Sequence, residues 1–403
     1  MNNERANLIA ISIRNSPFAI GALLAATTLA AQESASFGGP SSVGGQLAKA
    51  PEVRPWHPDA DNLKLGFDYS VFGQSASKGS GVTDAVGGVA RFYGTATLFR
   101  DDAGGTGALT FKVENRHRLS DTYAPQDLGF GIGYVGLTSV TYSNAGWILT
   151  NLYWDQTSAD NRFAVVAGIL DVTDYLDVYA YANPWADFSN LSFSTNPTIP
   201  SPNQGLGLAA RAMLSDNIYV VAGVADANGD PTRPENAFSS FFDTTEFFTH
   251  AEIGWVSSFA DRFTDNIHLT LWHADERPEA GVSEGSGVAL SASWKFAERF
   301  TPFARYGNSS GGGALMEQSA SIGLGYTPTR QNDVAAIGVN WGRPASESFG
   351  EGLSDQTTVE AFYNAQITPW LQVTPDIQYI TDPALAPEIP SMWLFGLRVK
   401  ATF

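Results

Sequence analysis

The last twelve residues, MWLFGLRVKATF at positions 392–403, decide the fold class. Their odd positions are all apolar, whereas the even positions include Arg398, Lys400 and Thr402. A side-chain period of two places alternate residues on opposite faces of a strand. The stretch therefore predicts a β-strand with one wholly apolar face that ends on Phe403.

The same division continues towards the N-terminus. Segments 371–379 and 357–367 also place apolar side chains on one face and polar side chains on the other. Further candidate strands bring the predicted total to sixteen. They lie near residues 63–73, 88–100, 107–117, 146–156, 161–171, 205–214, 217–226, 247–257, 265–273, 286–297, 301–308, 318–327 and 333–342.

The segments between the predicted strands alternate in length. Long connections, such as 118–145 and 172–204, are followed by short ones, such as 157–160 and 215–216. Transmembrane antiparallel β-barrels have this organisation, with short periplasmic turns and long extracellular loops. A soluble β-sandwich or propeller is the alternative, but it does not account for the purely apolar face, the loop pattern or the low charge content of 16%.

Composition excludes several other classes. The chain has 403 residues, no cysteine and a formal net charge of −18. Thiolate catalysis and cysteine-ligated zinc are thereby excluded, and the acidic balance argues against nucleic acid as a partner. We expect neither a metal site nor a cofactor.

The N-terminal region differs from the rest. Residues 1–31 carry Arg5 and Arg14, then an apolar stretch and small residues, which is typical of a signal peptide for export. Residues 32–62 are rich in Gly, Ser and Pro, which predicts a flexible periplasmic lead-in. The barrel domain is expected to cover residues 63–403.

Several motifs in the second half of the chain resemble the carbohydrate-selective porins, the OprB family of the Gram-negative outer membrane. The most specific runs from Ile367 to Ile380, ITPWLQVTPDIQYI, after the segment EAFY at 360–363. The segments PFARYG at 302–307 and GVNWG at 338–342 are also similar to the family. The resemblance implies a sixteen-stranded, water-filled pore through which small sugars diffuse passively across the outer membrane.

Polar groups that line a pore replace the hydration of the solute, and its charges set ion preference. On the inward phase of the strands we place thirteen candidate lining residues. They are Arg91, Lys112, Glu114, Arg116, Arg211, His250, Glu252, Lys295, Arg305, Glu360, Asp376, Arg398 and Lys400. Because the first strand of a barrel meets the last, Arg91, Arg398 and Lys400 are expected to share one basic wall with Lys64.

The connection 172–204 is long and unusually aromatic. Long loops in compact domains are commonly functional. We expect it to fold into the lumen and narrow it, with Tyr179, Tyr181, Trp185 and Asp187 as the constriction candidates. A cap on the outside of the barrel is the alternative position for this loop.

Two other functions remain open at this stage. The basic wall is compatible with a general or anion-preferring porin, and an outer-membrane barrel hydrolase is the main enzymatic alternative, although no nucleophile with a base is evident. The expected partners are small carbohydrate solutes, outer-membrane lipid and lipopolysaccharide. A homotrimer is one option for self-association, and the sequence does not fix the oligomeric state.

Overall fold

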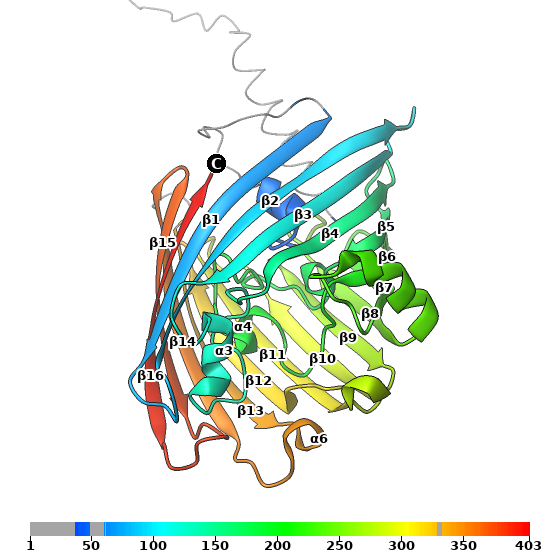
Figure 1. Ribbon diagram of the computed structural model, residues 1–403. Helices are drawn as coiled ribbons and strands as arrows, with labels where there is room; N and C mark the ends of the chain where they lie inside the picture. The colour runs from blue at the N-terminus through cyan, green and yellow to red at the C-terminus, as the bar shows by residue number, and fades with distance from the viewer. Residues whose placement is uncertain (1–36, 49–59, 61, 329–332) are drawn as a thin grey trace, which may run out of the picture.

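The chain forms one closed antiparallel barrel of sixteen strands (Figure 1). The computed structural model describes residues 37–48, 60, 62–328 and 333–403. Each strand pairs with its neighbours in sequence, and β1 (Leu63–Ala76) closes the ring on β16 (Ser391–Thr402). The predicted fold class is confirmed.

All sixteen predicted strands are present, and their bounds differ from the predicted ones by a few residues. The other strands are β2 Asp84–Arg100, β3 Thr106–Arg118, β4 Gly146–Thr157, β5 Phe163–Leu170, β6 Gly205–Met213, β7 Ile218–Asp226, β8 Phe247–Val256, β9 Asn266–Ala274, β10 Gly285–Ser293, β11 Phe300–Gly311, β12 Met316–Tyr326, β13 Val334–Pro344, β14 Gln356–Thr368 and β15 Leu371–Thr381. Strands β5 to β7 are much shorter than β1 to β3.

The two ends of the barrel differ in the length of their connections. Long loops of the kind expected join β3 to β4, β5 to β6 and β7 to β8 at one end, while turns such as 369–370 close the other. One predicted long loop is short: β11 extends to Gly311, and residues 312–315 then turn the chain. Gly311, Gly312 and Gly313 all have positive φ, which glycine adopts without steric cost.

The outer face of the barrel is apolar. In β16, Trp393, Phe395, Leu397 and Val399 are exposed, whereas Arg398 and Lys400 are buried inside. The alternation therefore has the phase expected for a wall in lipid, which is the reverse of that in a soluble barrel.

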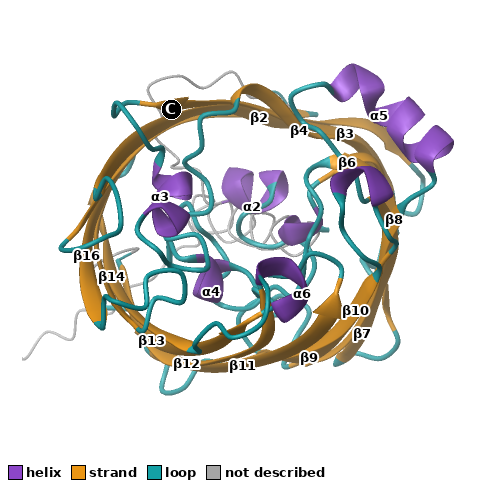
Figure 2. Ribbon diagram, turned by 60° about the horizontal axis from the view of Figure 1, so that its bottom comes forward, coloured by secondary structure: helices purple, strands orange, loops and turns teal. Residues whose placement is uncertain are grey.

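Loops and short helices fill much of the barrel interior (Figure 2). In Figure 2, α2, α3 and α4 lie within the ring of strands, whereas α5 lies outside it; α6 lies at the long-loop end of the barrel (Figure 1). None of the helices in the described part of the chain is long and apolar enough to cross a membrane. Their bounds are α2 Val43–Ala48, α3 Pro125–Gly131, η1 Val172–Asp174, α4 Leu191–Ser194, η2 Pro234–Asn236, α5 Ala237–Ser239, η3 Ser240–Thr244, η4 Pro278–Ala280 and α6 Ser346–Phe349.

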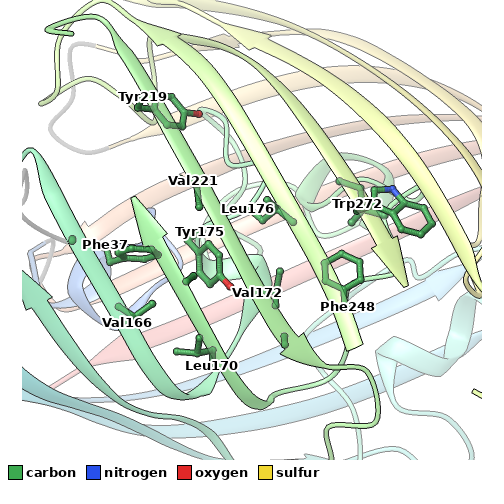
Figure 3. Packing of buried hydrophobic residues seen from close by; sticks show 14 of the residues in the cluster. Phe37, Val166, Leu170, Val172, Tyr175, Leu176, Tyr219, Val221, Phe248 and Trp272 are labelled. Atoms are coloured by element: carbon green, nitrogen blue, oxygen red, sulfur yellow. The ribbon is translucent and has the colours of Figure 1, made fainter. Parts of the chain in front are cut away.

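Apolar side chains also pack inside the barrel, where the loops meet the wall. Figure 3 shows one such cluster, in which Phe37 and Tyr175 lie beside Val166 and Leu170 of β5. Phe248 and Trp272 from β8 and β9 belong to the same cluster. The interior is thus polar only in part, because apolar side chains of the wall pack against apolar side chains of the loops instead of facing water.

Two predictions concern the N-terminal region, the signal peptide and the flexible lead-in. The predicted signal peptide, residues 1–31, lies outside the described residues. Of the predicted lead-in, residues 37–48 lie inside the barrel, with Phe37 and Val43 buried. This part of the predicted flexible periplasmic lead-in is docked, since Phe37 packs against Tyr175 in an interior cluster and Val43 is fully buried.

Candidate functional site

The inner loop, residues 171–204, connects β5 to β6 and crosses the barrel interior. It is held at its two ends by one residue: Asp171 Oδ2 accepts a hydrogen bond from Gln204 Nε2 at 2.7 Å. The other carboxylate oxygen accepts from the backbone N–H and the hydroxyl of Thr173, which starts the short helix η1. Asp171 thus closes the base of the loop and fixes the direction in which it leaves the wall.

The first anchor of the inner loop to the far wall is Asp177. Its Oδ1 accepts from Ser291 Oγ at 2.6 Å and lies 3.0 Å from His268 Nε2, while its Oδ2 pairs with the guanidinium of Arg305. Its backbone N–H donates to Glu252 at 2.8 Å. Burial raises the pKa of the Asp177 carboxyl, but Arg305, His268 and Ser291 together lower it by more, so that its pKa lies well below the usual range.

A second anchor lies on β14 and β15. Glu360 Oε1 accepts from the backbone N–H of Ser189 at 2.6 Å, and Oε2 accepts from that of Asn190 at 3.1 Å. The Asn190 side chain donates to Gln378 at 3.0 Å. Arg398 of β16 donates to the carbonyl oxygens of Pro184 and Asp187 at 2.7 and 2.8 Å. The loop is therefore bound to the wall on several strands, and the prediction that it folds into the lumen agrees with these contacts.

The aromatic residues of the loop separate into two groups. Tyr179 and Tyr181 are buried against Phe303 and do not line the cavity described below, so the expectation that they meet the solute is not supported. They instead pack the loop onto the wall, since a cluster of rings is more stable in contact than in water. Trp185 does line the cavity. Asp187 instead helps to anchor the loop, because its backbone carbonyl accepts the hydrogen bond from Arg398.

A cavity of about 590 Å³ lies between the inner loop, β3 and the long loops at one end of the barrel. This volume is within the range of small-molecule sites. Lys112, Glu114 and Arg116 of β3 line it together with Asp174 and Trp185 of the inner loop. Figure 2 shows the barrel from the end at which the long loops lie, towards which the cavity extends.

The charges in this cavity are balanced. Its charged lining residues are the cations Lys112, Arg116 and Arg277 and the carboxylates Glu114, Asp171 and Asp174. Three cations face three carboxylates, which leaves no net formal charge. Several are already paired, as Arg116 Nε lies 2.7 Å from Glu114 and Lys112 Nζ 3.8 Å from Asp174. Such an arrangement offers donors and acceptors to hydroxyl groups without favouring ions of either sign.

Asp174 is a lining carboxylate held by residues from two other segments of the chain. It accepts from Asn151 Nδ2 at 3.2 Å and from Ser41 Oγ at 3.4 Å. Burial raises the pKa of Asp174 to about 6; Lys112 lowers it and the neighbouring Asp171 raises it. Its charge therefore changes in the mildly acidic range.

Of the cations expected in the basic wall, Arg91 on β2 and Lys400 on β16 are buried inside the barrel near its closure, and their charges are covered. Arg91 makes a two-pronged ion pair with Asp68 at 2.7 and 2.6 Å, and both side chains are completely buried. Gln46 Oε1 lies 3.2 Å from Arg91 and 3.2 Å from Lys400 Nζ. A wall whose cations already have partners attracts anions far less than a bare one.

The remaining predicted residues have separate positions. Arg211 and His250 are buried inside the β5 to β8 side, and Asp376 lies within hydrogen-bonding distance of Gln378, at 3.2 Å. Glu252 accepts from Tyr219 and Thr270 at 2.7 Å each and holds the loop. Lys295 was placed on an inward strand phase by the alternation, but β10 ends at Ser293 and Lys295 lies exposed in the turn that follows.

Alternation alone missed three important carboxylates. Asp68 stands directly opposite Arg91 in the register of β1 and β2, so the signal for it is cross-strand charge pairing. Asp174 and Asp177 belong to the irregular inner loop, where no periodicity exists to place them. Among the described residues, no group of three or more histidine and carboxylate side chains is suited to a metal ion.

Comparison with known proteins adds to this geometry. The model of the family described as carbohydrate-selective porin, OprB family, matches residues 70–286 and 263–403. An uncharacterized protein of Aquifex aeolicus (strain VF5) is 25% identical over 249 residues, which is 59% of this chain and 64% of that protein. The match therefore spans less than two thirds of the length of this curated relative.

Two solved structures illustrate the similarity of fold. The high-pH structure of Pseudomonas putida OprB superposes with a TM-score of 0.64 at 15% identity, over 85% of this chain and 94% of that one. A mutant of Rh. blastica porin gives a TM-score of 0.52 at 11% identity, over 85% of this chain and all of the other. At these identities the likeness establishes the barrel architecture.

Proposed function

The chain belongs to the carbohydrate-selective porin family, OprB, and we propose that it lets small neutral sugars diffuse passively across the outer membrane, through the cavity between β3 and the inner loop. Family and fold together imply the outer membrane as its location. Because members of this family are channels, the chain is not an enzyme, which excludes the barrel hydrolase considered above.

The observation that carries the proposal is the balance of charge in the cavity. An anion-preferring channel needs uncovered cations, yet Arg91 is paired with Asp68 and Lys400 is in contact with Gln46. The cavity is lined by a mixed row, Lys112, Glu114 and Arg116, together with the carboxylate of Asp174. Fixed donors and acceptors of both kinds match the hydroxyl groups of a sugar, each of which can donate and accept.

Trp185 supplies the apolar part of the proposed sugar contact. Its ring borders the cavity, and the guanidinium carbon of Arg91 lies 3.8 Å from the ring centroid on the wall side. A ring fixed in this way presents a flat surface to the C–H groups of a pyranose. The solute would pass with its polar edge towards β3 and one face against Trp185.

The test is single-channel conductance of the refolded protein in a planar bilayer, with glucose or maltose added and with the reversal potential measured in a salt gradient. We expect stepwise openings, block by sugar that depends on its concentration, and a reversal potential near zero at neutral pH. Glu114→Gln is expected to weaken the block, with Glu298→Gln, in the turn after β10, as the matched control. Openings that no sugar affects, or a strong preference for chloride, would contradict the proposal.

We also propose export by the N-terminal signal peptide and assembly as a homotrimer. Assembly is supported by the side formed by β5 to β7, whose strands have eight or nine residues. Beside it, Phe238 and Phe242 are exposed on the helical segment outside the barrel. Phe238→Ser/Phe242→Ser is expected to shift the native mass from trimer to monomer. A wild-type protein that is monomeric in mild detergent would contradict the assembly.

A further inference from the structure

The segment 37–48, which includes α2, lies within the barrel and extends between two parts of its wall. At one end, Phe37 makes an edge contact with Tyr175 at a centroid distance of 5.2 Å (Figure 3). The guanidinium carbon of Arg211 on β6 lies 5.7 Å from the centroid of the Phe37 ring. At the other end, Gln46 reaches Arg91 on β2 and Lys400 on β16. The segment therefore occupies the interior between β6 and β16.

The polar contacts of this segment are made with groups of the channel itself. The backbone N–H of Gly39 donates to the carbonyl oxygen of Asp174 at 2.7 Å, and Ser41 Oγ is 3.4 Å from the Asp174 carboxylate. Gln46 is held in place by its own Nε2, which donates to Pro40 at 2.7 Å. The segment thus covers both the lining carboxylate and the cations of the basic wall.

Its position relative to the cavity is that of a floor. Ser41 lines the cavity beside Lys112 and Asp174, while the opposite part of the lining, such as Arg277 and Gly312, belongs to the long-loop end. Figure 1 shows α2 nearer to the short-turn end of the barrel than α3 and α4. A solute that enters from the long loops meets this segment before it reaches the short turns.

Residues 37–48 can also leave the barrel wall as a unit. A helix of six residues, such as α2, is far below the length at which helices are stable in water, so its order depends on docking. It forms no part of the sixteen-stranded ring, and its removal would break no pairing between strands. The side chains of the segment that are buried in its seat are those of Phe37, Ser41, Ser42, Val43 and Gln46.

From these contacts we propose that residues 37–48 form a plug that closes the channel on its short-turn side, and that the channel conducts when the plug leaves its seat against Asp174, Arg91 and Lys400. This inference rests on the proposed function, since it concerns the same solute path. It makes the N-terminal segment a regulator of the channel instead of a tether beneath it.

One test removes the docking contacts in the full-length protein. Phe37→Ser/Val43→Ser/Gln46→Ser is expected to raise the open fraction or the unitary conductance at least twofold. Leu47→Ser, a half-buried position in the same helix, is the matched control and is expected to behave as wild type. Equal conductance of the triple variant and wild type, both shown to be folded by their heat-modifiable mobility in gels, would overturn the plug.

A second test holds the plug in place. A Cβ atom built on Gly39 lies 3.5 Å from Cβ of Val178, which is within the separation that a disulfide needs. Because the chain has no cysteine, Gly39→Cys/Val178→Cys introduces one defined crosslink. We expect the oxidised protein to conduct at most half as much as the same sample after reduction, while each single variant is insensitive to reductant. A verified crosslink that leaves conductance unchanged would overturn the proposal.

Conductance and sugar block together distinguish the plug from the sugar function. If the triple variant conducts more than wild type but neither is blocked by sugars, the proposed sugar function is wrong and the plug stands. If sugars block both proteins and their conductance is the same, the plug is wrong and the sugar function stands.

Discussion

The central carbon of the Arg91 guanidinium lies 3.8 Å from the ring centroid of Trp185, and this contact joins the barrel wall to the inner loop. Arg91 is at the same time bound by both oxygens of Asp68. The ring that we assign to the sugar path is therefore fixed from behind by a residue that is itself fixed by the wall.

Replacement of Trp185 tests its contact with the solute. Trp185→Ala removes the flat surface and widens the cavity, so we expect weaker sugar block by roughly three- to tenfold, as for the loss of one aromatic contact, together with higher ion conductance. Titration of the block with maltose in planar bilayers gives the comparison. Trp147→Ala, on the exposed outer face of β4, is the control and should change neither quantity. Unchanged block in Trp185→Ala would remove Trp185 from the path.

The channel should become more selective for anions as the pH falls. The pKa of Asp174, raised to about 6 by burial, means that its carboxylate gains a proton between pH 8 and pH 5. The cavity then changes from no net formal charge to a positive one, so the reversal potential in a potassium chloride gradient should move towards chloride. In Asp174→Asn this shift should be absent, and the variant at pH 8 should resemble wild type at pH 5.

The same pKa has a consequence for stability. Because the folded-state pKa of Asp174 lies above the ordinary value, the folded protein binds this proton more tightly than the unfolded chain. Its contribution to the free energy of unfolding is fully present below about pH 4 and is lost as the pH rises through 6. Asp174→Asn should therefore flatten the pH dependence of urea unfolding over that interval. An identical pH dependence in variant and wild type would contradict this assignment.

The ion pair of Asp177 and Arg305 should hold the inner loop. Removal of one partner leaves the other charge buried and uncompensated, at a cost of about 3–5 kcal/mol in the free energy of unfolding. We expect Asp177→Leu and Arg305→Met each to lower stability in urea and to increase channel noise as the loop detaches. The double variant should lose less than the sum of the single variants. Additive losses would show that the two side chains act independently.

The outer face of β16 provides a test of the membrane position. Leu397 is exposed near the middle of the strand, where an arginine should cost about 2–4 kcal/mol of unfolding free energy in lipid bilayers. Ala401 lies on the same face near the strand end, where the cost should be about 0–1 kcal/mol. Leu397→Arg and Ala401→Arg, unfolded from vesicles in urea, should therefore differ. Equal losses would argue against the assigned depth of the strand.

The sequence alone carries most of the information on the wall. Lipid outside and loops or water inside impose a period of two on every strand, so segments such as 371–379 reveal both their extent and their phase. The prediction for Lys295 is wrong because the apolar–polar alternation continues past Ser293, where β10 ends, into a turn whose side chains no longer point to two opposite faces.

The contents of the barrel were less predictable. The inner loop is long and aromatic, which is enough to expect a role, but the roles of Tyr179 and Trp185 differ because one packs on Phe303 and the other borders the cavity. Such contacts depend on strands far away in sequence. The docking of Phe37 and Gln46 inside the barrel had no local signal, since a short Gly- and Ser-rich segment looks the same whether it is docked or free.

The contact between Gln46 and Lys400 joins positions that are 354 residues apart. Long-range contacts of this kind form late, because the entropy of closing such a loop must be lost before the contact stabilises anything. Both sides of the Gln46 seat, Arg91 and Lys400, meet only after β16 has paired with β1. The order of assembly that follows is a ring first and its contents afterwards, and a newly closed barrel would pass through a leaky stage before its N-terminal segment takes its place.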